Sequence, residues 1–127
     1  MSKTELIQRL DRVFSLYIRH RDAEDGYCRC ISCGRVGHVN DMQCGHFFSR
    51  SNMSTRWDED NCHAQCPTCN CTLLGNLGAY RDALIDKIGV GRIESLRTRS
   101  REVRKWSEAE LRDKIKYYTE KVKQLSQ

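Results

Sequence analysis

The chain has 127 residues, of which 39% are hydrophobic and 31% charged, with one proline and eight cysteines. This length suits a single domain, residues 1–127, and the composition excludes a collagen-like or disordered chain. No stretch approaches the roughly 20 apolar residues of a membrane span, and the N-terminus lacks the apolar core of a signal peptide. We therefore expect a cytoplasmic protein with no membrane partner.

The net charge of +5 is concentrated near the C-terminus. Residues 77–127 carry thirteen basic and eight acidic side chains, whereas basic and acidic residues balance in the rest of the chain. This basic helical C-terminal region predicts an anionic partner.

Four segments show helical or turn signals in chain order. In the region 1–21, apolar residues recur with helical spacing, and Ser2 with Glu5 forms a capping-box pattern, which predicts an N-terminal helix. Glycines between residues 22 and 45 predict small strands and turns. Pro67 suits the first position of a second helix, and a further helical run from Tyr80 ends at Gly89.

A last helix is predicted to start at Ser107, which forms a capping box with Glu110. Its apolar face consists of five residues with helical spacing: Leu111, Ile115, Tyr118, Val122 and Leu125.

Two C-x2-C pairs carry the strongest chemical signal. Each pair places two thiolates on one tight turn, and two such turns form the tetrahedral sulfur set that Zn²⁺ prefers. The predicted ligands of this structural zinc are Cys30, Cys33, Cys66 and Cys69. The alternative is that these are free cysteines buried in a core.

Four further cysteines lie near these pairs: Cys28, Cys44, Cys62 and Cys71. They are expected to be small buried hydrophobic residues, with an alternative pairing or a second zinc as the other interpretation.

The segment between the two pairs resembles the HNH, or ββα-metal, nucleases. The resemblance rests on Gly45-His46-Phe47 after the first pair, the run from Asn61 to Cys66, and Asn70 directly after Cys69. Together with Tyr17 to Asp22, Cys30 to Arg35 and Gly75-Asn76, these motifs are similar to the NinG, or Rap, recombination proteins of lambdoid phages.

The resemblance implies an α+β fold in which a zinc-stapled HNH-like core, residues 28–76, is flanked by N-terminal and C-terminal helices. It also implies a structure-specific DNA endonuclease that requires Mg²⁺, with Mn²⁺ as a substitute, and that cleaves branched recombination intermediates such as Holliday junctions. The expected partners are branched or single-stranded DNA, a recombinase and a second copy of the chain, in the cytoplasm of the host cell.

By the same resemblance, His46 is the general base, Asn70 offers its amide oxygen to Mg²⁺, and Asn61 braces the loop that follows His46. The alternatives are packing or zinc ligation for His46, a helix cap for Asn70 and an ordinary turn residue for Asn61. His63 is a second candidate ligand of the Mg²⁺ ion. Alternatively, it supports the residues that hold the ion without binding the ion itself, or it lies at the surface. Phosphodiester hydrolysis requires a base and a cation placed together, which these residue types can provide.

One position departs from the endonuclease VII-like pattern. An acidic metal ligand is expected immediately before the histidine, and this chain has Gly45 there. Asp41 is five residues from His46 and would face the opposite side of a regular strand. The acidic run 58–60 is another source of carboxylates.

Candidate DNA contacts are the arginines and the lysine near the insert and in the C-terminal region: Arg50, Arg56, Arg97, Arg99, Arg101, Arg104 and Lys105. Such residues bind phosphates without reading sequence, although charged runs are often simply solvated.

Three other functions compete with this interpretation. A non-catalytic zinc module would bind nucleic acid without a requirement for His46. A zinc-stabilised protein-interaction domain would use its basic residues only for solubility. A sequence-specific HNH enzyme would need a separate reader domain, which so short a chain does not offer.

Overall fold

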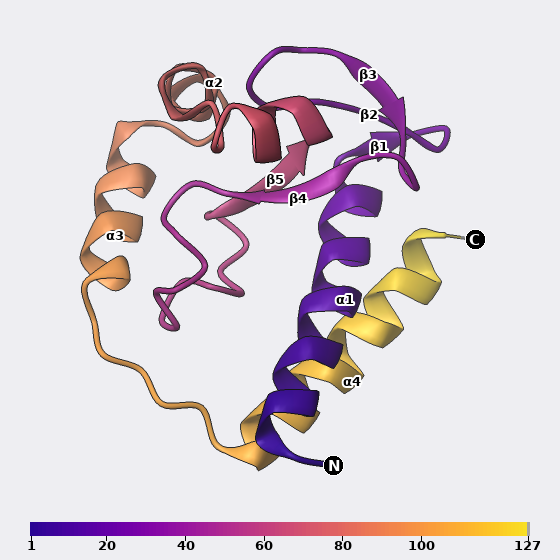
Figure 1. Ribbon diagram of the computed structural model, residues 1–127, viewed down its shortest axis with the longest axis vertical. Helices are drawn as coiled ribbons and strands as arrows, with labels where there is room; N and C mark the ends of the chain where they lie inside the picture. The colour runs from indigo at the N-terminus through magenta and orange to yellow at the C-terminus, as the bar shows by residue number, and fades with distance from the viewer. Residues whose placement is uncertain (127) are drawn as a thin grey trace.

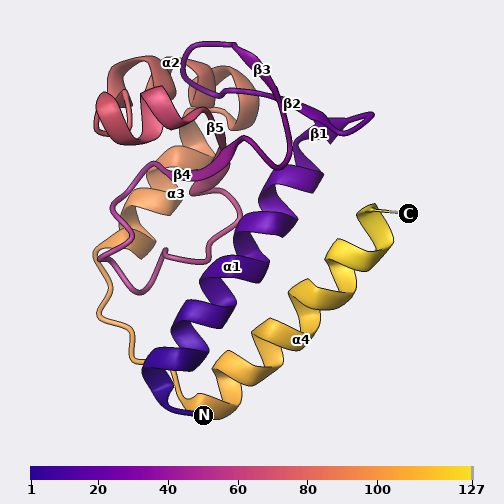
Figure 2. The same ribbon diagram turned by 45° about the vertical axis from the view of Figure 1, so that its right-hand side comes forward.

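Two long helices, α1 (Lys3–Arg21) and α4 (Glu108–Leu125), pack side by side along one edge of the molecule in the computed structural model, which describes residues 1–126. They run in the same direction, as Figure 1 and Figure 2 show. At the start of α1 the Ser2 hydroxyl accepts a hydrogen bond from the Glu5 N–H, and α4 begins with a complete capping box between Ser107 and Glu110.

Two small antiparallel sheets lie beyond the end of α1. The first sheet has the order β1-β2-β3, formed by Ala23–Glu24, Tyr27–Arg29 and Val36–His38. The second sheet is the hairpin of β4 (Gln43–His46) and β5 (Cys62–Gln65), joined by the loop 47–61. The fold is therefore small and of the α+β class.

A single π-helical turn, η1 (Thr68–Thr72), follows Pro67, whose own backbone is already helical (φ −57°, ψ −35°), as expected of a proline at the start of a helix. The helix predicted there is thus short, because Leu74, Gly75 and Asn76 all adopt positive φ and redirect the chain into α2 (Leu77–Ile88). Gly89, at φ +85°, separates α2 from α3 (Val90–Ser100), a helix that the sequence patterns did not predict.

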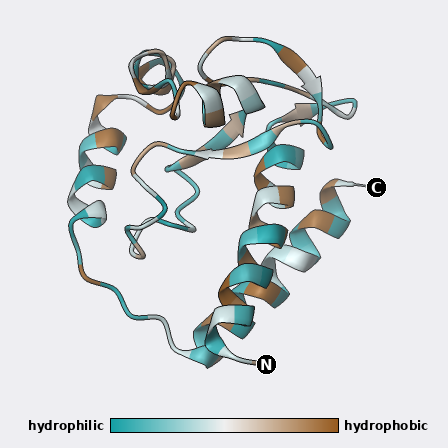
Figure 3. Cartoon of the chain, viewed as in Figure 1, coloured by the Kyte–Doolittle hydropathy of each residue, from teal (hydrophilic) through white to brown (hydrophobic). Residues whose placement is uncertain are grey.

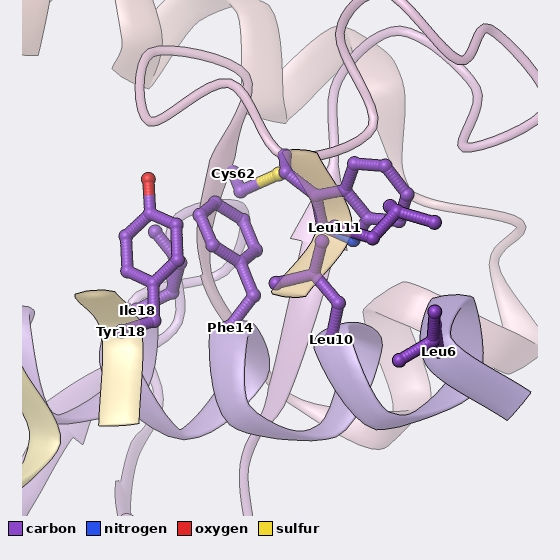
Figure 4. Packing of buried hydrophobic residues seen from close by; sticks show 8 residues of the cluster. Leu6, Leu10, Phe14, Ile18, Cys62, Leu111 and Tyr118 are labelled. Carbon is purple, nitrogen blue, oxygen red and sulfur yellow. The ribbon is translucent and has the colours of Figure 1, made fainter. Parts of the chain in front are cut away.

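The main core lies between α1, α4 and the hairpin loop. Figure 4 shows Leu10 and Phe14 of α1 and Cys62 of β5 gathered with Leu111 and Tyr118 of α4. Hydrophobic and hydrophilic residues alternate along both helices in Figure 3, as expected of amphipathic helices. Helix α1 packs against both β4 and β5 and so holds the hairpin in place.

Two smaller cores complete the fold. One surrounds the four cysteines of the two C-x2-C pairs, and the other joins α2 to α3 through Tyr80, Leu84 and Ile93. Among residues 1–126, no helix is long and apolar enough to cross a lipid bilayer.

Candidate functional site

The four cysteines of the two C-x2-C pairs meet at one point. Cys30 and Cys33 follow β2, Cys66 follows β5, and Cys69 lies in η1. Their sulfur atoms all lie within 4.8 Å of one another, and the sulfurs of Cys33 and Cys66 are 3.7 Å apart. An all-sulfur set of this size matches a tetrahedral zinc site, so this cluster can hold a structural metal such as zinc.

Hydrogen-bond donors stabilise the thiolate form of some of these cysteines, whereas burial raises the pKa of Cys69 to about 12. The backbone N–H of Cys69 donates to the sulfur of Cys66, and the Asn76 amide donates to the sulfur of Cys69. Burial opposes ionisation of Cys30, but hydrogen bonds from backbone N–H groups outweigh it and lower the pKa of that thiol to about 7.

His46 ends β4 with its ring oriented by the following loop. Its Nε2 lies 2.8 Å from the carbonyl oxygen of Arg56. A carbonyl can only accept a hydrogen bond, so Nε2 carries the proton and the neutral ring has its lone pair on Nδ1. Burial lowers the pKa of His46, and the imidazole is therefore neutral at pH 7.

Two neighbouring cavities, of about 300 Å³ and about 220 Å³, are both lined by His46 and Asn70. Cys44 and Arg50 also line both cavities. The structure thus brings together a histidine and an asparagine that lie 24 positions apart in the sequence, because η1 follows directly on β5 of the hairpin.

Asn70 is held at this place by β4. Its Nδ2 donates to the Gln43 Oε1 at 2.8 Å, while its Oδ1 accepts no hydrogen bond from residues 1–126. The amide oxygen is therefore the atom of Asn70 that remains available to a ligand.

Asn61 is fully buried at the base of the loop 47–61. Its Oδ1 accepts from the Phe48 N–H at 2.7 Å, and its Nδ2 donates to the carbonyls of Phe48 and Thr55, both at 3.0 Å. These three bonds tie the two ends of the loop, from which the carbonyl of Arg56 reaches His46.

His63 does not reach the two cavities. It pairs with Gly45 in the hairpin, so its side chain leaves the sheet on the face opposite to that of His46, and it is only 2% exposed. Its Nδ1 lies 3.0 Å from the Tyr80 hydroxyl, and burial lowers its pKa to about 3. The structure thus gives His63 a packing role against α2 and removes it from the candidate ligands of an ion beside His46.

The structure explains why glycine precedes the histidine. A Cβ at Gly45 would lie 2.1 Å from the Oε1 and 2.9 Å from the Cβ of Gln65, so a larger residue cannot fit without moving the neighbouring strand. The Tyr80 hydroxyl also donates to the Gly45 carbonyl at 2.8 Å. No acidic ligand can be placed here in this fold.

The other acidic residues considered from the sequence point elsewhere. Asp41 is exposed in the turn before β4. Within the run 58–60, Asp58 pairs with Arg99 at 2.8 Å, Glu59 accepts hydrogen bonds from two tyrosines, and Asp60 pairs with Arg92. This run fastens the loop to the surrounding helices.

The carboxylate that does line the smaller cavity is Asp11, from α1. Arg56 donates to both of its oxygens, at 3.0 and 2.6 Å, and the Trp57 indole donates at 3.0 Å. Burial opposes its ionisation, but these partners lower the pKa of Asp11. Sequence patterns did not identify Asp11. The one hint in the sequence is that this acidic residue stands directly beside the apolar stripe of the first helix.

The candidate phosphate-binding residues fall into two groups. Arg56 is largely buried against Asp11, and Arg99 pairs with Asp58, so both fasten the fold. Arg50 is well exposed at the mouth of the cavities although it also contacts Asp11 at 3.2 Å.

The remaining basic candidates lie on α3 and the segment before α4. Arg97 stacks on the Phe48 ring, and Arg104 stacks on Trp106 while it pairs with Glu110. Arg101 and Lys105 are exposed and have no ion-pair partner among residues 1–126.

A family model described as Bacteriophage Lambda NinG protein matches residues 1–127. The chain belongs to the NinG family. Protein ninG of Salmonella phage P22 is 31% identical over 120 residues, and the proteins ninG of Escherichia phage 933W and Escherichia phage lambda are 35% and 33% identical over 123 residues.

These NinG relatives are longer than the chain. The matches cover 94% of this chain but only 56–57% of each relative. The chain therefore spans little more than half the length of the curated relatives that it matches. No solved structure gives a significant match to it.

Proposed function

We propose that this NinG-family chain is a metal-dependent endonuclease of the HNH type that cleaves branched DNA during phage recombination. The observation that carries the proposal is the meeting of His46 and Asn70 at the same two cavities. In this proposal the β4–β5 hairpin and η1 form a ββα-metal core, and a zinc ion held by the four clustered cysteines fastens η1 to the end of β2.

The base in this reaction is the Nδ1 of His46. The Nε2–H of His46 donates a hydrogen bond to the Arg56 carbonyl, so the free lone pair on Nδ1 can accept a proton from a water molecule. Burial keeps the ring neutral near pH 7, which is the form that a general base needs. Asn61 acts as a positioning residue because it holds the loop that provides this carbonyl.

The side chains around the smaller cavity offer oxygen atoms of the type that Mg²⁺ prefers as ligands. They belong to Asn70, Gln43, Ser15 and the carboxylate of Asp11, and hard oxygen ligands are those that Mg²⁺ prefers. Asn70, with Asp11 as the nearby carboxylate, would hold the ion together with oxygens of the DNA phosphate. When bound, Mg²⁺ or Mn²⁺ would stabilise the negative charge that develops on the phosphate.

Phosphates of the DNA would approach along the exposed basic residues. Arg50 stands at the mouth of the cavities, and Arg101 with Lys105 provides unpaired positive charge on the segment between α3 and α4. Such contacts are independent of sequence and weaken steeply with salt. Incision of two strands at one junction needs two active sites, which favours a homodimer in this proposal, with a recombinase as a further partner.

A non-catalytic DNA-binding zinc module is the second candidate. It is favoured by the fact that, among residues 1–126, Asp11 is the one carboxylate lining the smaller cavity and is already paired with two arginines. Such a module would bind branched DNA without Mg²⁺ and would lose nothing when His46 is replaced.

Cleavage of four-way, flapped and linear DNA by the wild-type chain and by His46→Ala, each with Mg²⁺ and with EDTA, tests the proposal. We expect Mg²⁺-dependent cleavage of the branched DNAs and a loss of about 100-fold or more in the variant, the usual contribution of a general base. His38→Ala, at a histidine in β3, is the matched control, and an unchanged circular dichroism spectrum with retention of one Zn²⁺ per chain verifies that both variants fold. Equal cleavage by His46→Ala and wild type would refute the assignment of the base.

A further inference from the structure

A second group of potential metal ligands lies beside the four clustered cysteines without sharing a residue with them. The hairpin register pairs His46 with Cys62 and places Cys44 two residues before His46, on the same face of the sheet. One ligand atom from each of the three residues lies within 4.8 Å of the others. Two thiols and an imidazole at this separation form a typical ligand set for a thiophilic ion.

We propose that Cys44, His46 and Cys62 form a second metal site, specific for a thiophilic divalent ion such as Zn²⁺. Three protein ligands leave one coordination position for water, as in zinc sites that are not purely structural. Binding would convert both thiols to thiolates, and their two protons would pass to solvent.

The surroundings of the three residues support this assignment. Cys62 is fully buried against Phe14 and the rest of the main core, which fixes its sulfur in place (Figure 4). Cys44 and His46 are half-buried and line both cavities, so an ion can reach them from solvent. The other two cysteines outside the zinc cluster do not take part, because Cys71 is exposed beside Gln43 and Cys28 is packed in the core around that cluster.

Occupancy of this site would take a nitrogen of His46 and displace the ring from its role as a base. An excess of Zn²⁺ should therefore inhibit DNA cleavage, and this consequence alone rests on the proposed function. Binding of the metal itself is measured without DNA, so the two proposals can fail independently.

Titration with Co²⁺ tests the site directly. The probe is added anaerobically, in the presence of a phosphine reductant, to the 127-residue chain that already carries one Zn²⁺ per molecule. Co²⁺ does not displace Zn²⁺ from the four-cysteine cluster, because Zn²⁺ binds such ligands more tightly. We expect one Co²⁺ per chain with thiolate-to-metal charge-transfer absorption, and at least tenfold weaker binding in Cys44→Ala and in His46→Ala.

Cys71→Ala is the matched control and should bind Co²⁺ as wild type does, because this thiol lies outside the three-residue group. Retention of the first Zn²⁺ and an unchanged circular dichroism spectrum show that each variant is folded. Absence of the charge-transfer band in wild type would overturn the proposal, as would Co²⁺ binding by folded Cys44→Ala with wild-type affinity.

Discussion

Replacement of Asn61 by alanine tests how the loop beside His46 is held. The side chain is fully buried and makes three hydrogen bonds, one accepted from Phe48 and two donated to the carbonyls of Phe48 and Thr55. A buried hydrogen bond contributes about 1 kcal/mol, and an unpaired buried partner costs about 1–3 kcal/mol. Asn61→Ala should therefore lower the free energy of unfolding by about 3 kcal/mol, a large part of the stability of a small domain.

The measurement is urea-induced unfolding followed by circular dichroism at a fixed free Zn²⁺ concentration, since metal binding to the folded state would otherwise shift the midpoint. Asn52→Ala is the control, because the Asn52 side chain makes no hydrogen bond within residues 1–126, and its loss should stay below about 0.5 kcal/mol. A loss below about 1 kcal/mol for Asn61→Ala, or equal losses in both variants, would refute the view that Asn61 braces the loop.

Three further predictions concern acid, metal and DNA. Burial lowers the pKa of His63 to about 3. As pH falls, this histidine is therefore protonated in the unfolded chain before it is protonated in the folded chain. The free energy of unfolding should then fall by up to about 1.4 kcal/mol per pH unit below about pH 6.5. Urea midpoints at pH 5 and 7 should show a smaller difference in His63→Gln than in wild type. Removal of zinc by a strong chelator, or Cys66→Ser, should abolish the dispersion of the backbone amide signals of residues 28–76 in the NMR spectrum. An unchanged NMR spectrum would exclude a structural metal. Arg101→Ala should reduce the salt slope of DNA binding by about 1, measured by fluorescence anisotropy, whereas Arg99→Ala should chiefly reduce stability through loss of its pairing with Asp58.

Helices with a continuous apolar stripe were predictable from sequence. The stripes of α1 and α4 bury Leu10, Phe14, Leu111 and Tyr118 in one core, as their spacing indicated. In α3, by contrast, only Ile93 and Leu96 are buried, and arginines occupy much of the rest, so the stripe is too short to stand out. The turn after Pro67 was predicted as a helix because local signals mark where a helix begins but do not show the positive φ angles that end this one.

Pairings between distant side chains could not be predicted. Asp11 reaches Arg56 across 45 positions, and the same arginine's carbonyl orients His46. His46 and His63 lie on the two paired strands of the hairpin. The register, which pairs His46 with Cys62 and His63 with Gly45, places their side chains on opposite faces of the sheet. A shift of register by one residue would exchange these faces, so no local pattern could decide which histidine borders the cavities.

By itself, the sequence determined the chemistry of the four-cysteine cluster and the two amphipathic helices, since both depend on spacings of a few residues. The family resemblance already led us to expect Asn70 near His46, but only the tertiary structure decided that glycine must stand at position 45 against Gln65 and that Cys44 and Cys62 lie beside the histidine. These arrangements arise when a strand register and helix packing bring separate segments into contact, and such contacts leave no periodic signal along the chain.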